Sequence, residues 1–242
     1  QKRQVGSTFK PFVYATAINQ LRMSPCDKLP NTPYTIPQGK YGIPEDWSPK
    51  NSNDEYGGML TLKDALAGSV NTMSARLIDK VAPVNVVRLA EAAGIKTKIQ
   101  ANPSIALGAV DLSLLEMVSA YTTFANYGVH IAPLAITRIE DKEGNLLKEY
   151  FPDYQKEVIS PETAYTMIDM LRGTVQGVQL YEGGSILATG IRLRNLYGVS
   201  QDVAAKTGTT QNQSDGWFMG IVPNLATGVW TGGEHRSTHF EG

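Results

Sequence analysis

The stretch Gly6 to Tyr14, with the sequence GSTFKPFVY, is the part of the chain on which the prediction of the fold depends. It contains the tetrad Ser7–Lys10 (STFK), in which a lysine follows a serine by three positions. The apolar residues after the tetrad recur at helical spacing and predict a helix from about Ser7 to Asn19. Ser7 and Lys10 would then share one face of that helix, where a neutral amine can take the proton of a serine hydroxyl.

Two more short elements follow much later in the chain: Ser69-Val70-Asn71 and Lys206-Thr207-Gly208-Thr209. Any one of the three elements alone is more simply explained as a helix cap, a solvated lysine or a turn at a strand end. Together, and in this order, they form the pattern of serine β-lactamases and penicillin-binding proteins, with SVN in place of the usual SDN.

The sequence around these elements resembles the transpeptidase domain of class A penicillin-binding proteins along nearly the whole chain. The stretches that carry the resemblance are GSTFKPFVY at 6–14, ALGAVDLSLLEMVSAYTTF at 106–124, MLRGT at 170–174, KTGTTQNQSDGWF at 206–218 and TGVWTGG at 227–233. The resemblance implies a mixed α/β (α+β) fold of the penicillin-binding and serine β-lactamase type, in which helices flank an antiparallel sheet. Members of this family begin that sheet with two strands before the serine helix. We therefore expect residues 1–242 to be a partial transpeptidase domain, with a glycosyltransferase domain and a membrane anchor of the parent protein outside this chain.

The periodicity of the chain independently predicts several helices followed by a terminal set of strands. Helices are expected at 7–19, 61–67, 71–81, 83–93, 114–126 and 161–175. A hairpin is expected at 134–150, and an antiparallel meander at 203–209, 217–222 and 226–231. Residues 24–58 are expected to form a long extended segment, whose Tyr41, Trp47 and Tyr56 are predicted to pack rather than to line a substrate groove.

The composition argues against several other classes of function. The 242 residues carry a net charge of -1, with 42% hydrophobic residues, so no basic excess points to nucleic acid. No apolar run is long enough to span a bilayer. Cys26 is the only cysteine, which rules out an intrachain disulfide or a CxxC metal site within these residues. His235 and His239 have a zinc-like spacing but lie in a predicted strand or loop, so no metal is expected, and His130 is predicted to lie at the surface.

The chemistry of the first and third elements suggests how the serine could be activated. Ser7 is predicted to be the acylated nucleophile and Lys10 its base. Burial and a second cation, that of Lys206, would lower the pKa of Lys10 and favour its neutral form. An N–H group of the serine turn, together with that of Thr209, could hold the oxyanion of a tetrahedral intermediate.

The resemblance to the family assigns roles to the remaining motif residues. Ser69 would relay a proton to the leaving group, and Asn71 would orient both the lysine base and the substrate. The family's strand motif binds the terminal carboxylate of the substrate through its lysine and threonines, here Lys206, Thr207 and Thr209. Gly208 would be required because a side chain there would block a peptide lying along the strand edge.

The resemblance implies a peptidoglycan D,D-transpeptidase that cross-links stem peptides through a serine acyl-enzyme and is acylated by β-lactam antibiotics. Residues 72–205 contain no E-x-x-L-N stretch, which class A β-lactamases use to activate hydrolytic water, so we expect a long-lived acyl-enzyme. Two alternatives stay open: a D,D-carboxypeptidase that uses water as the acceptor, and a non-catalytic penicillin-binding or sensor module. The family works without metal or organic cofactor in the bacterial cell envelope, at the outer face of the cytoplasmic membrane, with other cell-wall synthesis proteins as expected partners.

Overall fold

The structure is a computed structural model that describes residues 1–177, 187–210 and 213–240. The helices are η1 (Gly6–Phe9), α1 (Lys10–Leu21), η2 (Lys40–Gly42), α2 (Leu62–Ala67), α3 (Asn71–Val81), α4 (Pro83–Ala92), η3 (Pro103–Leu107), α5 (Leu114–Ala125), α6 (Pro161–Gln176) and α7 (Arg192–Asn195), where η marks a 3-10 helix. The strands are β1 (Lys2–Gln4), β2 (Lys28–Pro30), β3 (Met59–Thr61), β4 (Asp111–Ser113), β5 (Val129–Ile131), β6 (Arg138–Glu140), β7 (Leu146–Glu149), β8 (Tyr154–Glu157), β9 (Ala204–Thr209), β10 (Asp215–Val222) and β11 (Leu225–Gly232). No helix in these described ranges combines the length and the apolar character that crossing a bilayer requires.

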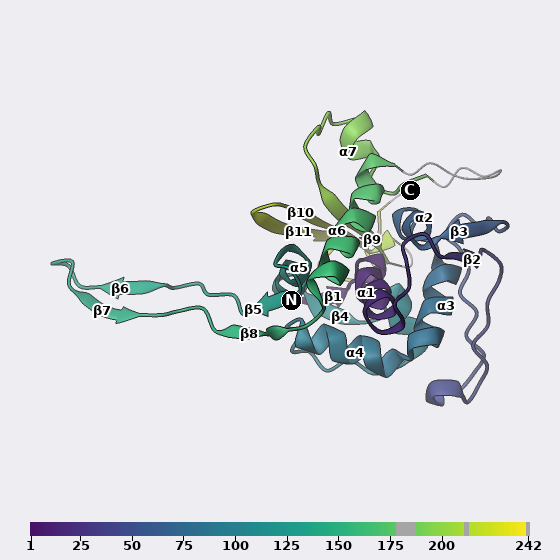
Figure 1. The fold of residues 1–242 in the computed structure, drawn as a ribbon, viewed down its shortest axis with the longest axis horizontal. Helices are drawn as coiled ribbons and strands as arrows, with labels where there is room; N and C mark the ends of the chain where they lie inside the picture. The colour runs from purple at the N-terminus through teal and green to yellow at the C-terminus, as the bar shows by residue number, and fades with distance from the viewer. Residues whose placement is uncertain (178–186, 211–212, 241–242) are drawn as a thin grey trace.

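The largest sheet is an antiparallel meander formed by the last three strands, in the spatial order β11-β10-β9 (Figure 1). Trp217 of β10 lies opposite Gly208 of β9 on one side and opposite Trp230 of β11 on the other. Helix α5 packs against β10 and β11, and α6 packs against β9. The predicted mixed α/β fold and its terminal meander are confirmed.

Helix α1 is the central helix of the molecule, because α3, α4 and α6 all pack against it. Every residue from Lys10 to Ile18 is buried, so this helix has no polar face that could be turned toward solvent. Helices that are apolar on all sides belong in the middle of a fold, and this one carries Lys10 into the interior.

The starts of α2 and α6 follow from their caps. The hydroxyl oxygen of Thr61 accepts a hydrogen bond from the backbone N–H of Asp64, and that of Ser160 accepts one from the N–H of Thr163. Each cap satisfies an N–H group that has no partner within its own helix, so serine and threonine at these positions mark the boundary in the sequence. Both predicted helix starts are confirmed.

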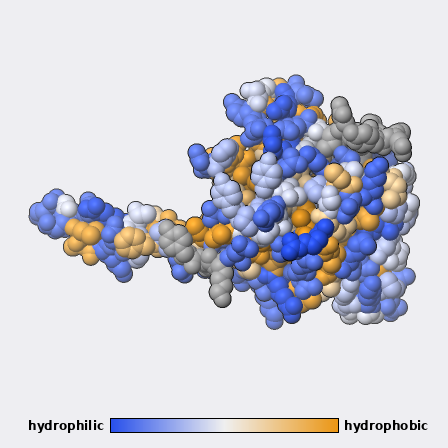
Figure 2. Space-filling model, viewed as in Figure 1, coloured by the Kyte–Doolittle hydropathy of each residue, from blue (hydrophilic) through white to orange (hydrophobic). Residues whose placement is uncertain are grey.

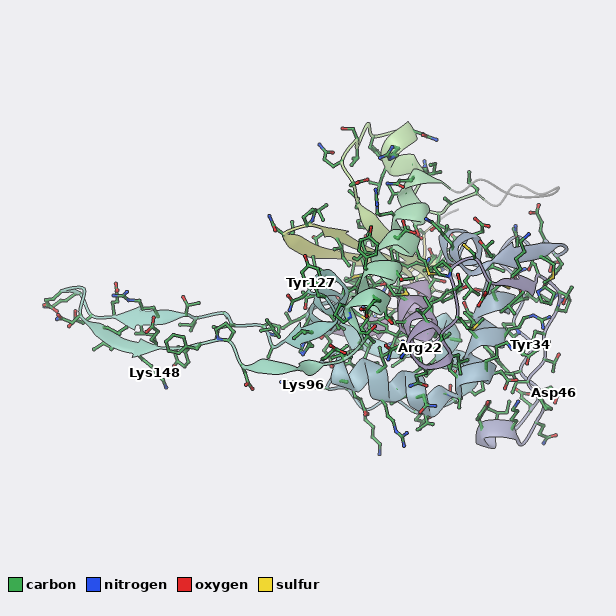
Figure 3. All side chains as sticks on the ribbon, viewed as in Figure 1. Arg22, Tyr34, Asp46, Lys96, Tyr127 and Lys148 are labelled. Atoms are coloured by element: carbon green, nitrogen blue, oxygen red, sulfur yellow. The ribbon has the colours of Figure 1, made fainter. Side chains whose placement is uncertain are left out.

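The long segment between α1 and α2 is extended, as predicted, and is folded against α3. Its ends pair as β2 and β3, and two N–H···O bonds of 2.9 Å join the backbones of Ile36 and Trp47. Tyr34, labelled in Figure 3, donates its hydroxyl hydrogen to Oδ2 of Asp79 on α3 (2.6 Å), and Tyr41 donates to the carbonyl oxygen of Asp79 (2.9 Å). These bonds make the segment a fixed wall beside α3.

Residues 134–150 form the predicted hairpin, but the paired strands β6 and β7 are shorter than expected. Oδ1 of Asp141 closes the turn by accepting hydrogen bonds from the N–H groups of Glu143 (2.9 Å) and Asn145 (2.8 Å). The hairpin projects away from the rest of the molecule in Figure 1, and apolar residues are visible along it in Figure 2. Its exposed apolar side chains are Leu134, Ile136, Ile139, Leu146, Leu147 and Phe151.

Two features differ from the expectations drawn from the sequence. Strand β1 pairs with β4, a pairing that the sequence pattern does not predict because three-residue strands contain too little periodicity.

The prediction that His130 lies at the surface is wrong. Its side chain is 3% exposed, and its Nε2 lies 3.0 Å from Oγ of Ser119 on α5. His130 belongs to β5, whose pairing with β8 and packing on α5 no local pattern reveals.

A capping box begins α5, as predicted, and its carboxylate also reaches a second segment. Glu116 accepts two hydrogen bonds from Ser113, the cap residue, and two from Thr97. Burial alone would raise the pKa of the Glu116 carboxyl group, but these four hydrogen bonds outweigh it and lower the pKa to about 2.

Glu116→Gln is expected to flatten the dependence of stability on acid pH. A carboxyl group whose pKa is lower in the folded state stabilises the fold above its unfolded pKa, and this stabilisation is lost as the pH falls. The wild-type free energy of unfolding in urea should therefore fall more steeply between roughly pH 5 and pH 2 than that of the variant. Two parallel acid profiles would contradict this interpretation of Glu116.

Candidate active site

Ser7 lies in η1, the turn that leads into α1, and other elements fix the backbone on both sides of it. The N–H of Gly6 donates to the carbonyl oxygen of Gly108, just after η3 (3.2 Å). The carbonyl oxygen of Thr8 accepts the hydroxyl hydrogen of Tyr121 from α5 (2.6 Å). The predicted nucleophile is thus half-buried on a turn whose position is set by η3 and α5.

Strand β9 passes so close to this turn that only glycine fits at the contact. A Cβ at Gly208 would lie 2.8 Å from the carbonyl oxygen of Val5 and 2.9 Å from Cγ2 of Thr8. The sequence analysis explains Gly208 by the need for room along the strand edge, whereas the structure shows that the serine turn is what leaves no room. Gly108 is under the same constraint: it has a φ of +74°, and a Cβ there would overlap the carbonyl group of Gly6.

Lys10 is fully buried, and three oxygen atoms surround its Nζ. These are the carbonyl oxygen of Ser69 at 2.5 Å, Oγ of Ser69 at 3.1 Å and Oδ1 of Asn71 at 2.7 Å. Asn71 is the first residue of α3, and its Nδ2 donates to the carbonyl oxygen of Lys50 (2.7 Å). With its nitrogen bound in this way, the Asn71 amide presents its oxygen to Lys10.

Lys206 reaches Ser69 from β9 and is also fully buried. Its Nζ lies 3.0 Å from Oγ of Ser69 and 3.1 Å from the carbonyl oxygen of Thr207. Oγ of Ser69 therefore bridges the amines of two lysines. The φ of Ser69 is +57°, a conformation that is uncommon for a residue with a Cβ and is maintained only where the surroundings enforce it.

The two lysines have lowered pKa values, for physical reasons that the structure makes clear. Burial, followed by the positive charge of Lys206, holds the pKa of Lys10 well below its usual value. Burial lowers the pKa of Lys206 to about 7. The three oxygen acceptors around Lys10 oppose this shift because they stabilise an ammonium group, but burial and the second lysine outweigh them. A neutral amine is therefore accessible at this site near neutral pH.

Ser7 opens into a groove of about 320 Å³, lined by Gln4, Gly6, Ser7, Trp47, Asn71, Ser104, Leu107, Ala109, Thr209 and Thr210. A second hollow of about 460 Å³, between residues 41–47 and 100–104, shares Trp47 and Ser104 with the first. The prediction for Trp47 is thus only half right, since this residue packs on the core and also lines the groove. Thr207 is not among the lining residues, and its hydroxyl donates to Oγ1 of Thr189 (2.7 Å).

The structure brings the three sequence elements together at one place, between η1, the start of α3 and β9. They combine a half-buried serine hydroxyl, buried amines of low pKa and a second hydroxyl that contacts both amines. Such a set is suited to acyl transfer through a covalent serine intermediate. In residues 1–177, 187–210 and 213–240, no group of three or more His, Cys, Asp or Glu side chains is placed to hold a metal ion.

A family model described as the penicillin binding protein transpeptidase domain matches residues 1–233. The chain belongs to the penicillin-binding protein transpeptidase family. The resemblance inferred from the motifs is confirmed, and the fold agrees with it.

Similar proteins of known name support the same assignment. Penicillin-binding protein 1A of Aquifex aeolicus is 35% identical over 232 residues, which is 95% of this chain and 29% of that protein. The crystal structure of penicillin-binding protein 1A from Haemophilus influenzae matches 98% of this chain and 39% of its own, with a TM-score of 0.87 and 28% identity. PonA1 from Mycobacterium tuberculosis, solved in complex with penicillin V, matches 95% and 60% of the two chains, with a TM-score of 0.73 and 26% identity. The chain spans less than a third of the length of the curated relatives that it matches.

Several residues that support the site were not identified from the sequence. Tyr121 holds Thr8, as described above, and Nε1 of Trp217 on β10 donates to the carbonyl oxygen of Gln4 (2.9 Å). Asp215 is 1% exposed and accepts a hydrogen bond from Nε1 of Trp230 (2.9 Å). Tyr121 and Trp217 are far from their partners in sequence, and the only signal in the sequence is that five of these six residues lie within stretches shared with the penicillin-binding family.

Gly108→Ala is expected to destabilise the fold far more than Gly144→Ala. Both glycines have positive φ, at +74° and +85°, so alanine at either position costs about 1–2 kcal/mol in backbone strain. Only at Gly108 does the new methyl group meet backbone, that of Gly6, which should raise the total to roughly 4 kcal/mol or more. Urea unfolding of both variants measures the difference, and equal losses would show that the serine turn tolerates displacement.

Removing the positive charge of Lys206 is expected to raise the pKa of Lys10. In Lys206→Gln the repulsion between two buried amines is gone, whereas Lys148→Gln, on the exposed hairpin, removes a charge far from the site. NMR titration of the Lys10 side chain would measure its pKa. The Lys10 resonance would be assigned by its absence from the spectrum of Lys10→Arg. A Lys10 pKa that is the same in Lys206→Gln and wild type would show that the two amines do not interact.

Proposed function

We propose that this chain is a peptidoglycan D,D-transpeptidase with Ser7 as its nucleophile. The observation that carries the proposal is the position of Oγ of Ser69, within 3.1 Å of Nζ of both Lys10 and Lys206. Asn71, which contacts the same Lys10 amine, lines the groove into which Ser7 opens. This arrangement supplies a base for a serine nucleophile and a route by which the proton can reach a leaving amine.

In the acylation step, Oγ of Ser7 attacks the carbonyl carbon of a D-Ala–D-Ala terminus while its proton passes to the neutral amine of Lys10. The C–N bond then breaks, and the leaving amine of the last D-Ala takes a proton from Oγ of Ser69, which Lys10 reprotonates. The backbone N–H groups of Ser7 and Thr209 are the proposed donors to the oxyanion, since both residues line the groove. Lys206, with Thr207 and Thr209, is the proposed site for the terminal carboxylate.

In the second step, an amine of a neighbouring stem peptide attacks the ester carbonyl carbon at Ser7. The new amide bond is the cross-link, and Oγ of Ser7 regains its proton as it leaves. The groove and the hollow beyond Trp47 offer room for extended peptides on this side of the molecule. A β-lactam antibiotic would acylate the same serine, and the absence of an E-x-x-L-N stretch from residues 72–205 favours a slow release of that adduct.

We further propose that this domain works as part of a longer cell-wall synthesis protein. The 29% share of the Aquifex aeolicus relative that the chain covers supports this. By the resemblance to class A members, such a protein would carry a glycosyltransferase domain upstream and would be anchored at the outer face of the cytoplasmic membrane, beside other cell-wall synthesis proteins.

Benzylpenicillin is expected to add the mass of one drug molecule to the protein, at Ser7. Whole-protein mass spectrometry should detect the adduct in wild type and in Ser200→Ala, which alters an exposed serine. Ser7→Ala should form none, because no other hydroxyl among the described residues combines the serine turn with the two buried amines. An adduct that persists in Ser7→Ala would remove the central assignment.

Product analysis with a stem pentapeptide is expected to yield a cross-linked dimer. A free tetrapeptide without dimer would indicate that water is the acceptor and that the chain is a D,D-carboxypeptidase. If penicillin acylates Ser7 and neither peptide product forms, the chain would be a penicillin-binding module without turnover.

A further inference from the structure

A buried pair of asparagines outside the three motifs meets the start of α3. Asn31 and Asn51 are each 7% exposed, and Nδ2 of Asn51 donates to Oδ1 of Asn31 (2.8 Å). Both belong to the long segment between α1 and α2, which otherwise consists mostly of exposed or half-exposed residues. Two buried polar side chains in such a segment call for a specific role.

Asn51 satisfies the first N–H groups of α3 from outside the helix. The residue before the helix, Val70, has no side-chain group that could cap it. Instead, Oδ1 of Asn51 accepts hydrogen bonds from the backbone N–H groups of Asn71 and Thr72, both at 3.1 Å. The first turn of α3, and with it Asn71, is therefore held by a residue twenty positions earlier in the chain.

All the hydrogen-bonding capacity of the Asn51 amide is used, which fixes its orientation. Its Nδ2 donates to the carbonyl oxygen of Glu55 (2.8 Å) as well as to Asn31, while its Oδ1 serves α3. Oδ1 of Asn31 accepts a further hydrogen bond from Oγ1 of Thr72 (3.0 Å). Aspartate at position 51 would keep both acceptor bonds but turn an oxygen toward Oδ1 of Asn31 and the carbonyl oxygen of Glu55, and alanine would lose all four bonds.

Two consecutive residues of this segment hold Asn71 in two ways. The side chain of Asn51 binds the backbone N–H of Asn71, and the carbonyl oxygen of Lys50 binds its Nδ2 (2.7 Å). The remaining polar atom of the Asn71 amide, Oδ1, lies 2.7 Å from Nζ of Lys10. The contact with the lysine is thus set by a chain of hydrogen bonds that begins in the long segment.

We propose that Asn51, supported by Asn31, is a positioning residue for acylation, because it sets the place of the Asn71 amide against Lys10. The proposal rests on the proposed function of Ser7 and Lys10 and adds to it a residue that belongs to none of the three motifs.

The charges around Lys10 make a sharp test possible. Lys206 on β9 is the charged side chain that faces it, while Ser69 and Asn71 contribute neutral groups. In the part of the chain that the structure describes, Lys10 forms no ion pair, and Glu55 offers Asn51 only its backbone carbonyl. A carboxylate at position 51 would thus bring a negative charge next to Asn71 and favour the ammonium form of Lys10.

Three variants separate positioning from mere folding: Asn51→Ala, Asn51→Asp and Asn53→Asp. Asn53 is the matched control, because it is exposed in the same segment and its side chain hydrogen-bonds to Glu55 and not to α3. For each protein we would measure the rate of acylation by a fluorescent penicillin from pH 5 to 9. Circular dichroism would verify the fold, and NMR would follow the ionisation of the Lys10 side chain.

Asn51→Ala is expected to slow acylation on the order of 10- to 100-fold while remaining folded, because Asn71 is displaced. Asn51→Asp keeps both bonds to α3, and the Asn31 amide can turn its nitrogen toward the new oxygen, so this variant should fold even if the alanine variant does not. Its acylation profile and the ionisation of Lys10 should both shift to higher pH, whereas Asn53→Asp should match wild type.

Equal Lys10 titrations in Asn51→Asp and Asn53→Asp, or wild-type acylation in folded Asn51→Ala, would overturn the proposal. If the wild-type protein forms no penicillin adduct, the proposed function fails. The NMR titration, which needs no turnover, would still decide whether Asn51 controls the surroundings of Lys10.

Discussion

Nζ of Lys10 and Nζ of Lys206 lie 3.1 and 3.0 Å from the same hydroxyl oxygen, that of Ser69, and both lysine side chains are fully buried. Two ammonium groups placed so close together inside a protein repel each other strongly, so the site favours a state in which one amine is neutral. Three parts of the structure hold the two amines in this unfavourable arrangement. Helix α1 carries Lys10 into the interior, and β9 of the meander carries Lys206. Ser69, in the turn before α3, has a left-handed conformation. A buried amine of such a pair can be neutral near neutral pH, whereas an isolated lysine in water is an ammonium ion.

The three elements meet at a common point because backbone packs directly on backbone there. Gly208 of β9 contacts the serine turn on one side, and Gly108 contacts it on the other through Gly6. Side chains can adjust by changing rotamer, whereas a glycine contact of this kind fixes the distance between two backbone segments. The position of Ser7 is consequently determined by two segments that lie about one hundred and about two hundred residues after it in the chain.

The sequence predicts those parts of the fold whose causes are local. Serine and threonine caps at Thr61 and Ser160 mark helix starts because the groups that they satisfy lie three residues away. The order of the motifs predicts the site because the family resemblance supplies the long-range contacts that no local pattern contains. Where neither source applies, prediction fails: His130 is buried by pairing with a distant strand. Asn51 acts on a helix start twenty residues later. The Asn51 amide forms four hydrogen bonds, and a single sequence contains no pattern that reveals these partners.

Strand β9 ends the meander within the described residues, so the side of it away from β10 faces the serine turn and the groove. A free strand edge attracts extended chains of any kind, and proteins guard such edges against self-association with charges that point inward, among other means. Lys206 is an inward-pointing lysine on this edge, fully buried in the middle of the strand. Two residues further on, at Gly208, the serine turn already covers the strand and leaves another copy of the chain no room to pair there. The same backbone contact that places the serine turn against β9 therefore also closes this part of the strand edge to self-association.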